Sequence, residues 1–320
     1  MAGIPLTRRA LLNATLAGAA SLSLSPLLAR EALARKIARP KLTVTRLADD
    51  LLLIEGAGGN VVVHGGDQEL LMVDGGVSHL TDPLLQRIAA ETGNRPVKTI
   101  LNTHWHWDHT GANETLARDG ATLIAHENTR LWLGAEIHSQ WEQRTYPPRP
   151  PAALPNQTFF YDSKFIELKG EQIEYGYLPQ AHTDGDIYVF FPTHNVMVAG
   201  DVIAGERYPI VDYSTNGWIG GMIAGLNILL EKTEATTRFV PGRGTVRSRA
   251  DVQAQLELCE TMIKRISASY YRGETWEEFA ASKPTSEFDA RWGDPTTFLR
   301  TAYESAWGHI NEIRRYSRSG

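Results

Sequence analysis

Three histidines and an aspartate lie within six positions of one short stretch, NTHWHWDHTGANE, as His104, His106, Asp108 and His109. An apolar segment, VKTILN, precedes them and predicts a β-strand. Alternate residues of an extended chain point to the same side, so we expect His104 and His106 to converge on one point. Asp108 and His109 follow a turn later and can face a second point nearby. Imidazole and carboxylate are ligands of zinc and related ions, so this spacing predicts a metal centre.

A catalytic zinc site has a characteristic composition. It keeps three protein ligands and one open position for water, and it lowers the pKa of that water to about 7. Hydroxide is then available as a nucleophile at neutral pH. A surface or core role would explain a single histidine, whereas three histidines with an aspartate at this spacing favour a metal-activated nucleophile.

His104-x-His106-x-Asp108-His109 after a strand resembles the signature of the metallo-β-lactamase superfamily. Three further motifs agree in order: VDGG at 73–76, AHTDGD at 181–186 and AGD at 199–201. The resemblance spans roughly residues 45–250. It implies an α/β fold, the four-layer αββα metallo-β-lactamase sandwich, with metals at one edge between its two sheets.

The resemblance also implies a set of metal ligands, carried over position by position. The first metal would be bound by His104, His106 and His182. The second metal would be bound by Asp108 and His109, and Asp201 would bridge the two metals. Asp74 would lie behind the ligands and orient one of the histidines. Asp184 and Asp186 either help in the same way or cap the turn after a strand, and we favour the turn.

The sequence departs from the family pattern at the last ligand. Where the family has a histidine in a Pro-Gly-His-Gly turn, this chain reads VPGRGTV, with Arg243. Arginine has no lone pair to give, and a guanidinium about 6 Å from a divalent ion costs roughly 5 kcal/mol at an effective dielectric of ~20. The charges of the site are therefore better balanced with a single metal ion, with Arg243 in place of the second cation. Arg243 would then pair with Asp201 or clamp an anionic substrate. Alternatively it faces solvent, and the remaining ligands hold a second metal.

The leading functional hypothesis is a metal-dependent hydrolase with one or two zinc ions per chain. Metal-activated hydroxide would attack a small-molecule substrate, with Asp108 orienting the water and Arg243 near the substrate. The same ligands serve esters, lactones, β-lactams, thioesters and phosphodiesters across the family; Asp201 argues mildly against a typical β-lactamase. A second hypothesis is an oxidoreductase like the family's mononuclear-iron sulfur dioxygenases. A third is a binding protein that has lost its chemistry through Arg243.

Residues 1–34 have the order of an export signal. Arg8 and Arg9 precede a moderately apolar run, and Ala32-Leu33-Ala34 forms a small-x-small cleavage site. The paired arginines resemble a twin-arginine signal; an ordinary secretory signal or a buried helix are the alternatives. We expect cleavage near Ala34 and a periplasmic or secreted protein. The nearest cysteine is far from this site, so no lipid anchor is expected.

Two apolar hairpins, over 61–74 and 188–201, each end at an aspartate of the predicted site. Their second strands, 70–73 and 196–199, are continuously apolar, as sheets covered on both faces require. Helices are expected from Asp82 to Gly93 and over 127–138. A Pro-rich stretch, 145–157, is expected to lack regular structure and to serve as a connector or line the site.

The C-terminal part is predicted to be helical. Apolar residues from Val252 to Ile266 recur at four- and three-residue spacing, Thr275 and Glu278 form a capping box, and Asp294-Pro295 opens a last helix that carries Phe298, Trp307 and Ile310. Cys259 lies in the apolar stripe and is expected to be buried. We expect one metallo-β-lactamase domain over 41–250, with a helical extension over 251–320 packed on it.

Composition limits the partners. The chain has 320 residues, 42% of them hydrophobic, which suffices for one large domain with a substantial core. No apolar run after residue 40 is long enough for a membrane span. The formal charge is −5 with mixed signs and no basic stripe, so neither a nucleic acid nor a membrane anchor is expected. The single cysteine excludes an intrachain disulfide.

Overall fold

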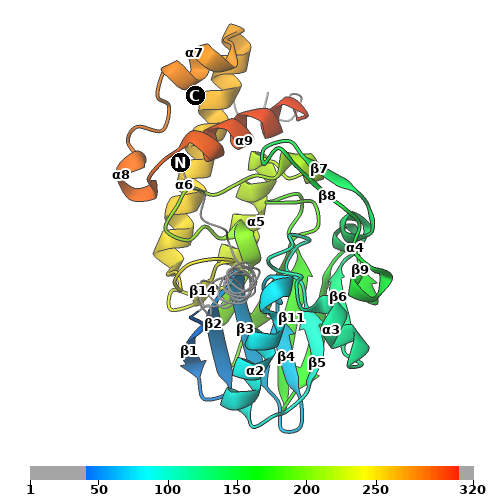
Figure 1. Ribbon diagram of the computed structural model, residues 1–320. Helices are drawn as coiled ribbons and strands as arrows, with labels where there is room; N and C mark the ends of the chain where they lie inside the picture. Colours follow the sequence, from blue (N-terminus) through cyan, green and yellow to red (C-terminus); the bar gives the residue numbers. More distant parts are fainter. Residues whose placement is uncertain (1–40, 310–320) are drawn as a thin grey trace, which may run out of the picture. The chain divides into compact units, whose positions relative to one another are not determined.

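The computed structural model describes residues 41–309. Residues 42–309 form one compact unit (Figure 1). The expected export signal lies outside the described residues, and so does Ile310 in the last expected helix.

The first sheet has seven strands in the order β1-β2-β3-β4-β5-β6-β9. Their bounds are Thr43–Ala48, Leu51–Ala57, Gly59–Gly65, Leu70–Val73, Val97–Leu101, Thr122–His126 and Gln157–Phe159. Strands β1 to β4 pair antiparallel, whereas β4, β5, β6 and β9 pair parallel. The carboxyl ends of β4 and β5 therefore share one edge, which brings Asp74 beside the stretch that begins at Asn102.

The second sheet has five strands in the order β10-β11-β12-β13-β14. Their bounds are Ser163–Leu168, Glu171–Tyr177, Ile187–Phe191, Val196–Val198 and Arg238–Val240. Strands β13 and β14 pair parallel and the others antiparallel. The residues that follow β13 and β14 therefore lie at the edge where β12 begins. A separate hairpin joins β7 (Ile137–Ser139) to β8 (Arg144–Tyr146).

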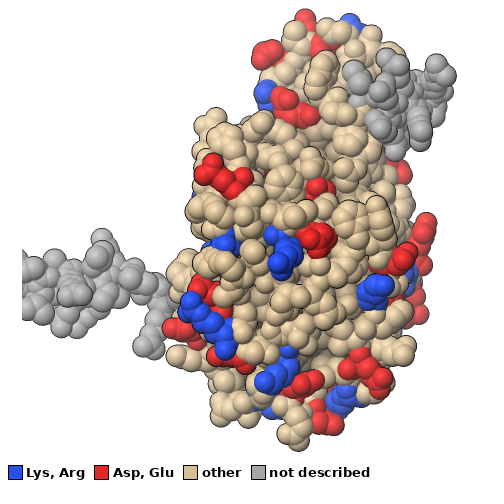
Figure 2. Space-filling model, turned by 90° about the vertical axis from the view of Figure 1, so that its right-hand side faces the viewer, with Lys and Arg blue, Asp and Glu red and all other residues tan. Residues whose placement is uncertain are grey.

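Helices cover both outer faces (Figure 1). They are α2 Thr81–Thr92, α3 Asn113–Arg118, α4 Glu127–Gly134, α5 Ile219–Glu231, α6 Arg249–Arg272, α7 Trp276–Ala281, α8 Asp289–Trp292 and α9 Thr296–Trp307. Short 3-10 helices occur at Ser78–Leu80, Pro151–Ala153, Gly200–Val202 and Tyr213–Thr215. Within residues 41–309 no helix combines the length and apolar character that crossing a membrane requires. Acidic and basic side chains are interspersed on the face shown in Figure 2.

Alternating side chains of the strands build three apolar layers. Leu51 and Leu53 of β2 pack in the cluster between the two sheets. Leu52 and Ile54 point the other way and pack with residues of α2 and α3. The outer face of the second sheet packs with α5, α6 and α9. This two-residue alternation gives the order helix, sheet, sheet, helix, so the predicted αββα sandwich is confirmed.

The C-terminal helices share a core with the second sheet. Val252, Cys259 and Ile263 of α6 are fully buried in the same cluster as Met197 of β13 and Leu226 of α5. Phe298 of α9 lies in that cluster as well, whereas Trp307 is 65% exposed. The apolar stripe predicted for α6 thus faces the sandwich rather than solvent.

The sequence predicted some ends of helices and strands correctly and others wrongly. Gly93 ends α2 with a φ of 71°, and the capping box of Thr275 and Glu278 begins α7. The helix predicted over 127–138 was wrong only in its last four residues: α4 ends at Gly134, and 137–139 pair with 144–146 as a hairpin. The Pro-rich stretch also contains more regular structure than expected. It supplies part of β8 and a 3-10 helix whose first turn suits proline's fixed φ.

Candidate metal centre

The predicted site residues come from loops at one edge of the sandwich. Asp74 follows β4, the segment 104–109 follows β5, and Asp201 and Arg243 follow β13 and β14. His182 lies in the loop between β11 and β12. Parallel pairing places the ends of β4 and β5 together, and likewise those of β13 and β14. Residues as far apart as 74 and 243 therefore meet in one cluster.

Four residues place metal-binding atoms around one point. The ligand atoms of His104, His106, His182 and Asp201 all lie within 4.8 Å of one another. His104 Nε2 is buried and has no hydrogen-bond partner among the described residues. His106 Nδ1 lies 3.1 Å from His182 Nε2, while the other nitrogen of His182 contacts the Ile210 carbonyl oxygen at 2.9 Å. Convergent nitrogens and an unpaired buried nitrogen fit a metal ion.

The electrostatics keep His104 and His182 neutral. Burial, with His109 and His106 adding to it, holds the pKa of His104 well below its usual value. Burial and the neighbouring His106 lower the pKa of His182 to about 4. A neutral imidazole offers the lone pair that a metal needs, so both residues are in the binding form at neutral pH.

Asp201 faces a second group of predicted ligands as well. Its Oδ2 lies 3.9 Å from His182 Nε2, and its Oδ1 lies 3.5 Å from His109 Nε2. Asp108 Oδ2 lies 3.7 Å from the same His109 nitrogen, which makes no hydrogen bond to any described residue. Burial would lower the pKa of His109, but Asp74 and Asp108 outweigh it and raise that pKa well above its usual value. One oxygen of Asp201 thus points to each half of the cluster.

Asp74 lies behind His109. Its backbone has a φ of 62°, a conformation that few non-glycine residues adopt. The carboxylate accepts hydrogen bonds from the backbone nitrogen of Thr103 at 2.8 Å and from its hydroxyl at 2.7 Å, and contacts His109 Nδ1 at 2.8 Å. The last contact turns His109 Nε2 toward Asp108 and Asp201, as a carboxylate behind a metal-binding histidine does.

Arg243 points into the cluster. Its Nη1 donates to Asp201 Oδ2 at 2.8 Å, and its Nη2 donates to Asp108 Oδ2. Burial alone would raise the pKa of Asp201, but Arg243, His109 and His104 together outweigh it and hold that pKa well below its usual value. Of the roles considered from the sequence, the structure shows pairing with Asp201, extended to Asp108; the side chain remains 51% exposed.

The turn that carries Arg243 requires glycine beside the cluster. Asn60 donates hydrogen bonds to the carbonyl oxygens of Pro241 at 2.9 Å and Gly244 at 2.8 Å, which fixes the turn from the first sheet. A Cβ atom on Gly242 would lie 1.9 Å from Asp201 Oδ1. Only glycine lets this backbone approach the carboxylate so closely.

Asp212 is a contributor that the sequence motifs missed. It is fully buried in the loop before the 3-10 helix Tyr213–Thr215, and its carboxylate contacts His106 Nε2 at 3.1 Å. It also accepts hydrogen bonds from the Thr215 hydroxyl at 2.7 Å and the Trp141 indole at 3.0 Å. By contacting Nε2, it leaves Nδ1 of His106 directed at His182. No motif surrounds Asp212, so only the fold reveals this contact.

The two other aspartates of the AHTDGD motif have local partners. Asp186 accepts from the backbone nitrogen and the hydroxyl of Thr183, both at 2.8 Å, and burial raises its pKa well above the usual value. Asp184 accepts from the Trp132 indole at 2.6 Å and from the Asn216 amide at 2.8 Å. These bonds fit the role in the turn favoured from the sequence.

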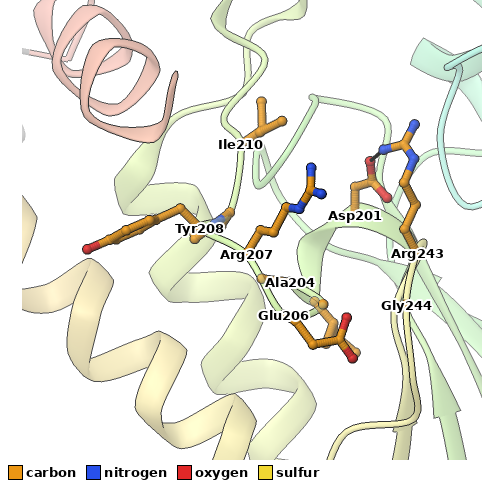
Figure 3. Close-up of a pocket in the computed structure, with 11 residues that line it drawn as sticks. Asp201, Ala204, Glu206, Arg207, Tyr208, Ile210, Arg243 and Gly244 are labelled. Carbon is orange, nitrogen blue, oxygen red and sulfur yellow. Dashed lines mark hydrogen bonds and ion pairs between the residues drawn. The ribbon is translucent and has the colours of Figure 1, made fainter. Parts of the chain in front are cut away.

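Two cavities meet at the cluster. One, of about 510 Å³, is lined by Trp107, Trp141 and Arg144 together with Asp108 and the histidines 106 and 182. The other, of about 540 Å³, is lined by residues 203–210. Asp201, Ile210 and Arg243 line both. Figure 3 shows the second cavity, with Arg207 extending between Ile210 and Asp201 and with Tyr208 turned away.

The chain belongs to the metallo-β-lactamase superfamily, whose family model matches residues 54–265. This assignment agrees with the sandwich and with the histidine–aspartate cluster at its edge. Together, family and cluster support a metal-dependent hydrolase.

Three relatives show how widely the family varies. The chain is 30% identical over 168 residues to the α subunit of a 2,4-dinitroanisole O-demethylase from a Nocardioides species, covering 51% of this chain and 45% of the relative. It is 31% identical over 137 residues to hydroxyacylglutathione hydrolase GloC of Haemophilus influenzae, covering 41% and 63%. It is 23% identical over 215 residues to a type 2 metallo-β-lactamase of Bacteroides fragilis, covering 63% and 79%. The matches span less than two thirds of the first two relatives.

Solved structures share the fold. A metallo-β-lactamase from Pontibacter korlensis matches with a TM-score of 0.56 at 17% identity, covering 69% of this chain and 99% of that one. The sec-alkyl sulfatase PisA1, as a double mutant, matches with a TM-score of 0.62 at 14% identity, covering 75% and 45%. At these identities the likeness establishes the fold.

Proposed function

We propose that this protein is a zinc hydrolase with a single metal position in its catalytic centre, acting on an anionic small molecule. The observation that carries the proposal is the convergence of His104, His106, His182 and Asp201, whose ligand atoms lie within 4.8 Å of one another. Zinc held there would make hydroxide available at neutral pH. Imidazole nitrogens with one carboxylate are a usual ligand set for zinc.

Arg243 supports the single metal. Its guanidinium bonds to Asp108 and Asp201, two carboxylates that a second metal would need. These bonds are charge-assisted, and the arginine stays protonated at any working pH. The cation of the side chain thus balances the carboxylates in place of a second divalent ion. Asp108, held by Arg243 beside His109, is in a position to orient a water molecule.

The charges around the cavities favour an anionic substrate. Arg243 lines both cavities and is half exposed, so it can turn one edge of its guanidinium to a ligand. Arg207 lines one cavity, is exposed, and forms no ion pair within residues 41–309. Trp107 and Trp141 provide apolar wall in the other cavity. An apolar body with a carboxylate, phosphate or sulfate group would match these surfaces.

The bond that is broken requires a direct assay. The relatives are named as a hydroxyacylglutathione hydrolase, a metallo-β-lactamase and an O-demethylase subunit. The panel should therefore contain esters, lactones, thioesters, β-lactams and phosphodiesters, each with and without a negative group. We expect the protein to turn over at least one anionic member of the panel, and to turn over the neutral analogue of that substrate more slowly.

His106→Ala tests the centre itself. We expect it to lose zinc at this centre and reduce turnover to background while keeping its circular dichroism spectrum, because the three apolar layers do not depend on the metal. His138→Ala is the matched control, since His138 is exposed on β7. Unchanged turnover in His106→Ala would refute the proposal. Iron instead of zinc, with oxygen consumption, would favour the mononuclear-iron oxidoreductase.

A further inference from the structure

A second cluster of histidines and carboxylates lies at the other edge of the sandwich. Asp50 lies in the turn between β1 and β2, His64 near the end of β3, Glu171 at the start of β11 and His194 in the turn between β12 and β13. Strand β3 runs antiparallel to β4, so its end lies away from Asp74. Two residues come from each sheet, and none belongs to the metal centre described above.

Histidine and carboxylate atoms converge in this cluster as well. Ligand atoms of Asp50, His64 and His194 all lie within 4.8 Å of one another. Glu171 Oε2 lies 3.1 Å from His64 Nε2 and 3.2 Å from His194 Nδ1. Despite these short distances, Oε2 makes no hydrogen bond to any described residue. Oε1 accepts one from the backbone nitrogen of Thr193 at 3.0 Å and lies 3.3 Å from His194 Nδ1, within hydrogen-bonding distance. Oε2 therefore points between two histidines without being satisfied by either.

The spacing suits one small cation. Zinc binds nitrogen and oxygen at about 2.0–2.1 Å, so tetrahedral ligand atoms stand roughly 3.3 Å apart. The distances from Glu171 Oε2, 3.1 Å to His64 and 3.2 Å to His194, are close to that value. A hydrogen bond requires a defined angle at the hydrogen, and neither contact of Oε2 meets it. One metal ion bound by Oε2 and by a ring nitrogen of each histidine would satisfy this oxygen.

Asp50 lies where a supporting carboxylate is expected. Its Oδ1 contacts His194 Nε2 at 2.8 Å, which leaves Nδ1 of the same ring directed at Glu171. A carboxylate on the far nitrogen of a metal-binding histidine fixes the ring and raises its basicity. Lys169 contacts the other oxygen of Asp50 at 3.1 Å and is 45% exposed. Its charge is therefore paired on the outer side of the cluster.

Burial makes unsatisfied polar atoms here costly. His64 is 1% exposed and Glu171 is 7% exposed, and His64 Nδ1 has no hydrogen-bond partner in the described part of the chain. A buried carboxylate oxygen without a partner costs more than a neutral polar group would. A cavity of about 270 Å³, lined by all four residues, gives an ion access to the cluster.

We propose that this cluster is a second zinc-class metal site, with His64, His194 and Glu171 as ligands and Asp50 orienting His194. Because the ligands come from both sheets, the ion links the first sheet to the second at the edge remote from the catalytic centre. Its role is structural. Without a metal, a proton on His194 would have to join the two carboxylates instead, and that arrangement is the alternative that the experiment detects.

Zinc per chain is counted after the purified full chain is equilibrated with zinc and passed through a desalting column. Glu171→Gln keeps an oxygen that can accept from the backbone of Thr193 but removes the charge. We expect it to hold one zinc ion fewer per chain than the wild type, and to lose the upward shift in melting temperature that zinc gives. Asp50→Asn, a milder change in a surface turn, is expected to weaken zinc binding at this cluster about 10–100-fold.

His138→Ala is the control and is expected to keep both the zinc count and the thermal shift. His106→Ala should lose the catalytic zinc yet retain the shift that depends on Glu171, which separates the two sites. Folding of each variant is checked by circular dichroism. Wild-type zinc counts in folded Glu171→Gln and wild-type affinity in Asp50→Asn would overturn the proposal and leave a metal-free network of His194 with its carboxylates.

Discussion

Arg243 and Asp201 are joined by a hydrogen bond from Nη1 to Oδ2 across 2.8 Å, inside the histidine–aspartate cluster at the edge of the sandwich. The same guanidinium donates to Asp108. A permanent positive charge thus stands where the family pattern has a neutral histidine. The two carboxylates that a second metal ion would need are already paired with Arg243, and this pairing is the physical basis of the proposed one-metal centre.

The glycine beside Arg243 is expected to be indispensable. In Gly242→Ala, the new Cβ atom would lie 1.9 Å from Asp201 Oδ1, so either the carboxylate or the turn must move. We predict a loss of about 10–100-fold in zinc affinity at the centre, a size typical of changes that displace a ligand's support. Zinc titration against a competing chelator measures this.

Gly134→Ala is the matched control. A Cβ atom there would lie 3.7 Å from Leu154 Cδ1, an ordinary contact, at the end of α4. Its zinc affinity should equal that of the wild type. If Gly242→Ala also binds zinc normally, Asp201 does not depend on the close approach of this turn.

Asp212 is expected to support the metal through His106. All its partners donate to it, so in Asp212→Asn an amide NH₂ would face a donor. We predict zinc affinity about 10–100-fold weaker and a free energy of unfolding lower by about 1–3 kcal/mol. Asp184→Asn also removes a buried acceptor but one without a histidine contact. It should lose stability while keeping its zinc affinity; equal zinc affinity in both variants would contradict the role of Asp212.

Much of the candidate centre was predictable because its candidate ligands lie in short motifs that follow apolar strands. The pattern at 104–109 and the aspartates at 74 and 201 mark strand ends, and parallel pairing then brings those ends together. The αββα layers were expected from the resemblance to the metallo-β-lactamase superfamily, and the continuously apolar strands at 70–73 and 196–199 agreed with sheets covered on both faces. The end of α2 followed from Gly93.

Contacts between loops were not predictable in this way. Asp212 reaches His106 across 106 positions of sequence, and nothing near it marks a site. The second cluster brings together residues from four separate turns and strand ends, and none of these residues lies in a recognisable sequence motif. The sequence pattern at 127–138 predicted a helix, but residues 137–139 pair with 144–146 in the hairpin β7-β8. Such pairing depends on tertiary contacts, which local propensity does not determine.

Export is predicted to depend on the paired arginines near the N-terminus. Replacing Arg8 and Arg9 with lysine keeps the charge but removes the motif that resembles a twin-arginine signal. The variant is expected to accumulate in the cytoplasm as uncleaved precursor, which fractionation and mass spectrometry of the N-terminus detect. Normal export with cleavage near Ala34 would instead indicate the general secretory route.

The most direct test of the single-metal centre is a count of zinc per chain in Glu171→Gln and in Glu171→Gln with Arg243→His. The first change removes the second cluster's contribution, so the count reports the catalytic centre alone. We predict one zinc in the first protein and two in the second, because histidine adds a ligand and removes a positive charge, which at about 6 Å from the ion and an effective dielectric of ~20 is worth roughly 5 kcal/mol. Two tightly bound zinc ions in Glu171→Gln alone, at a centre that still contains Arg243, would contradict the account.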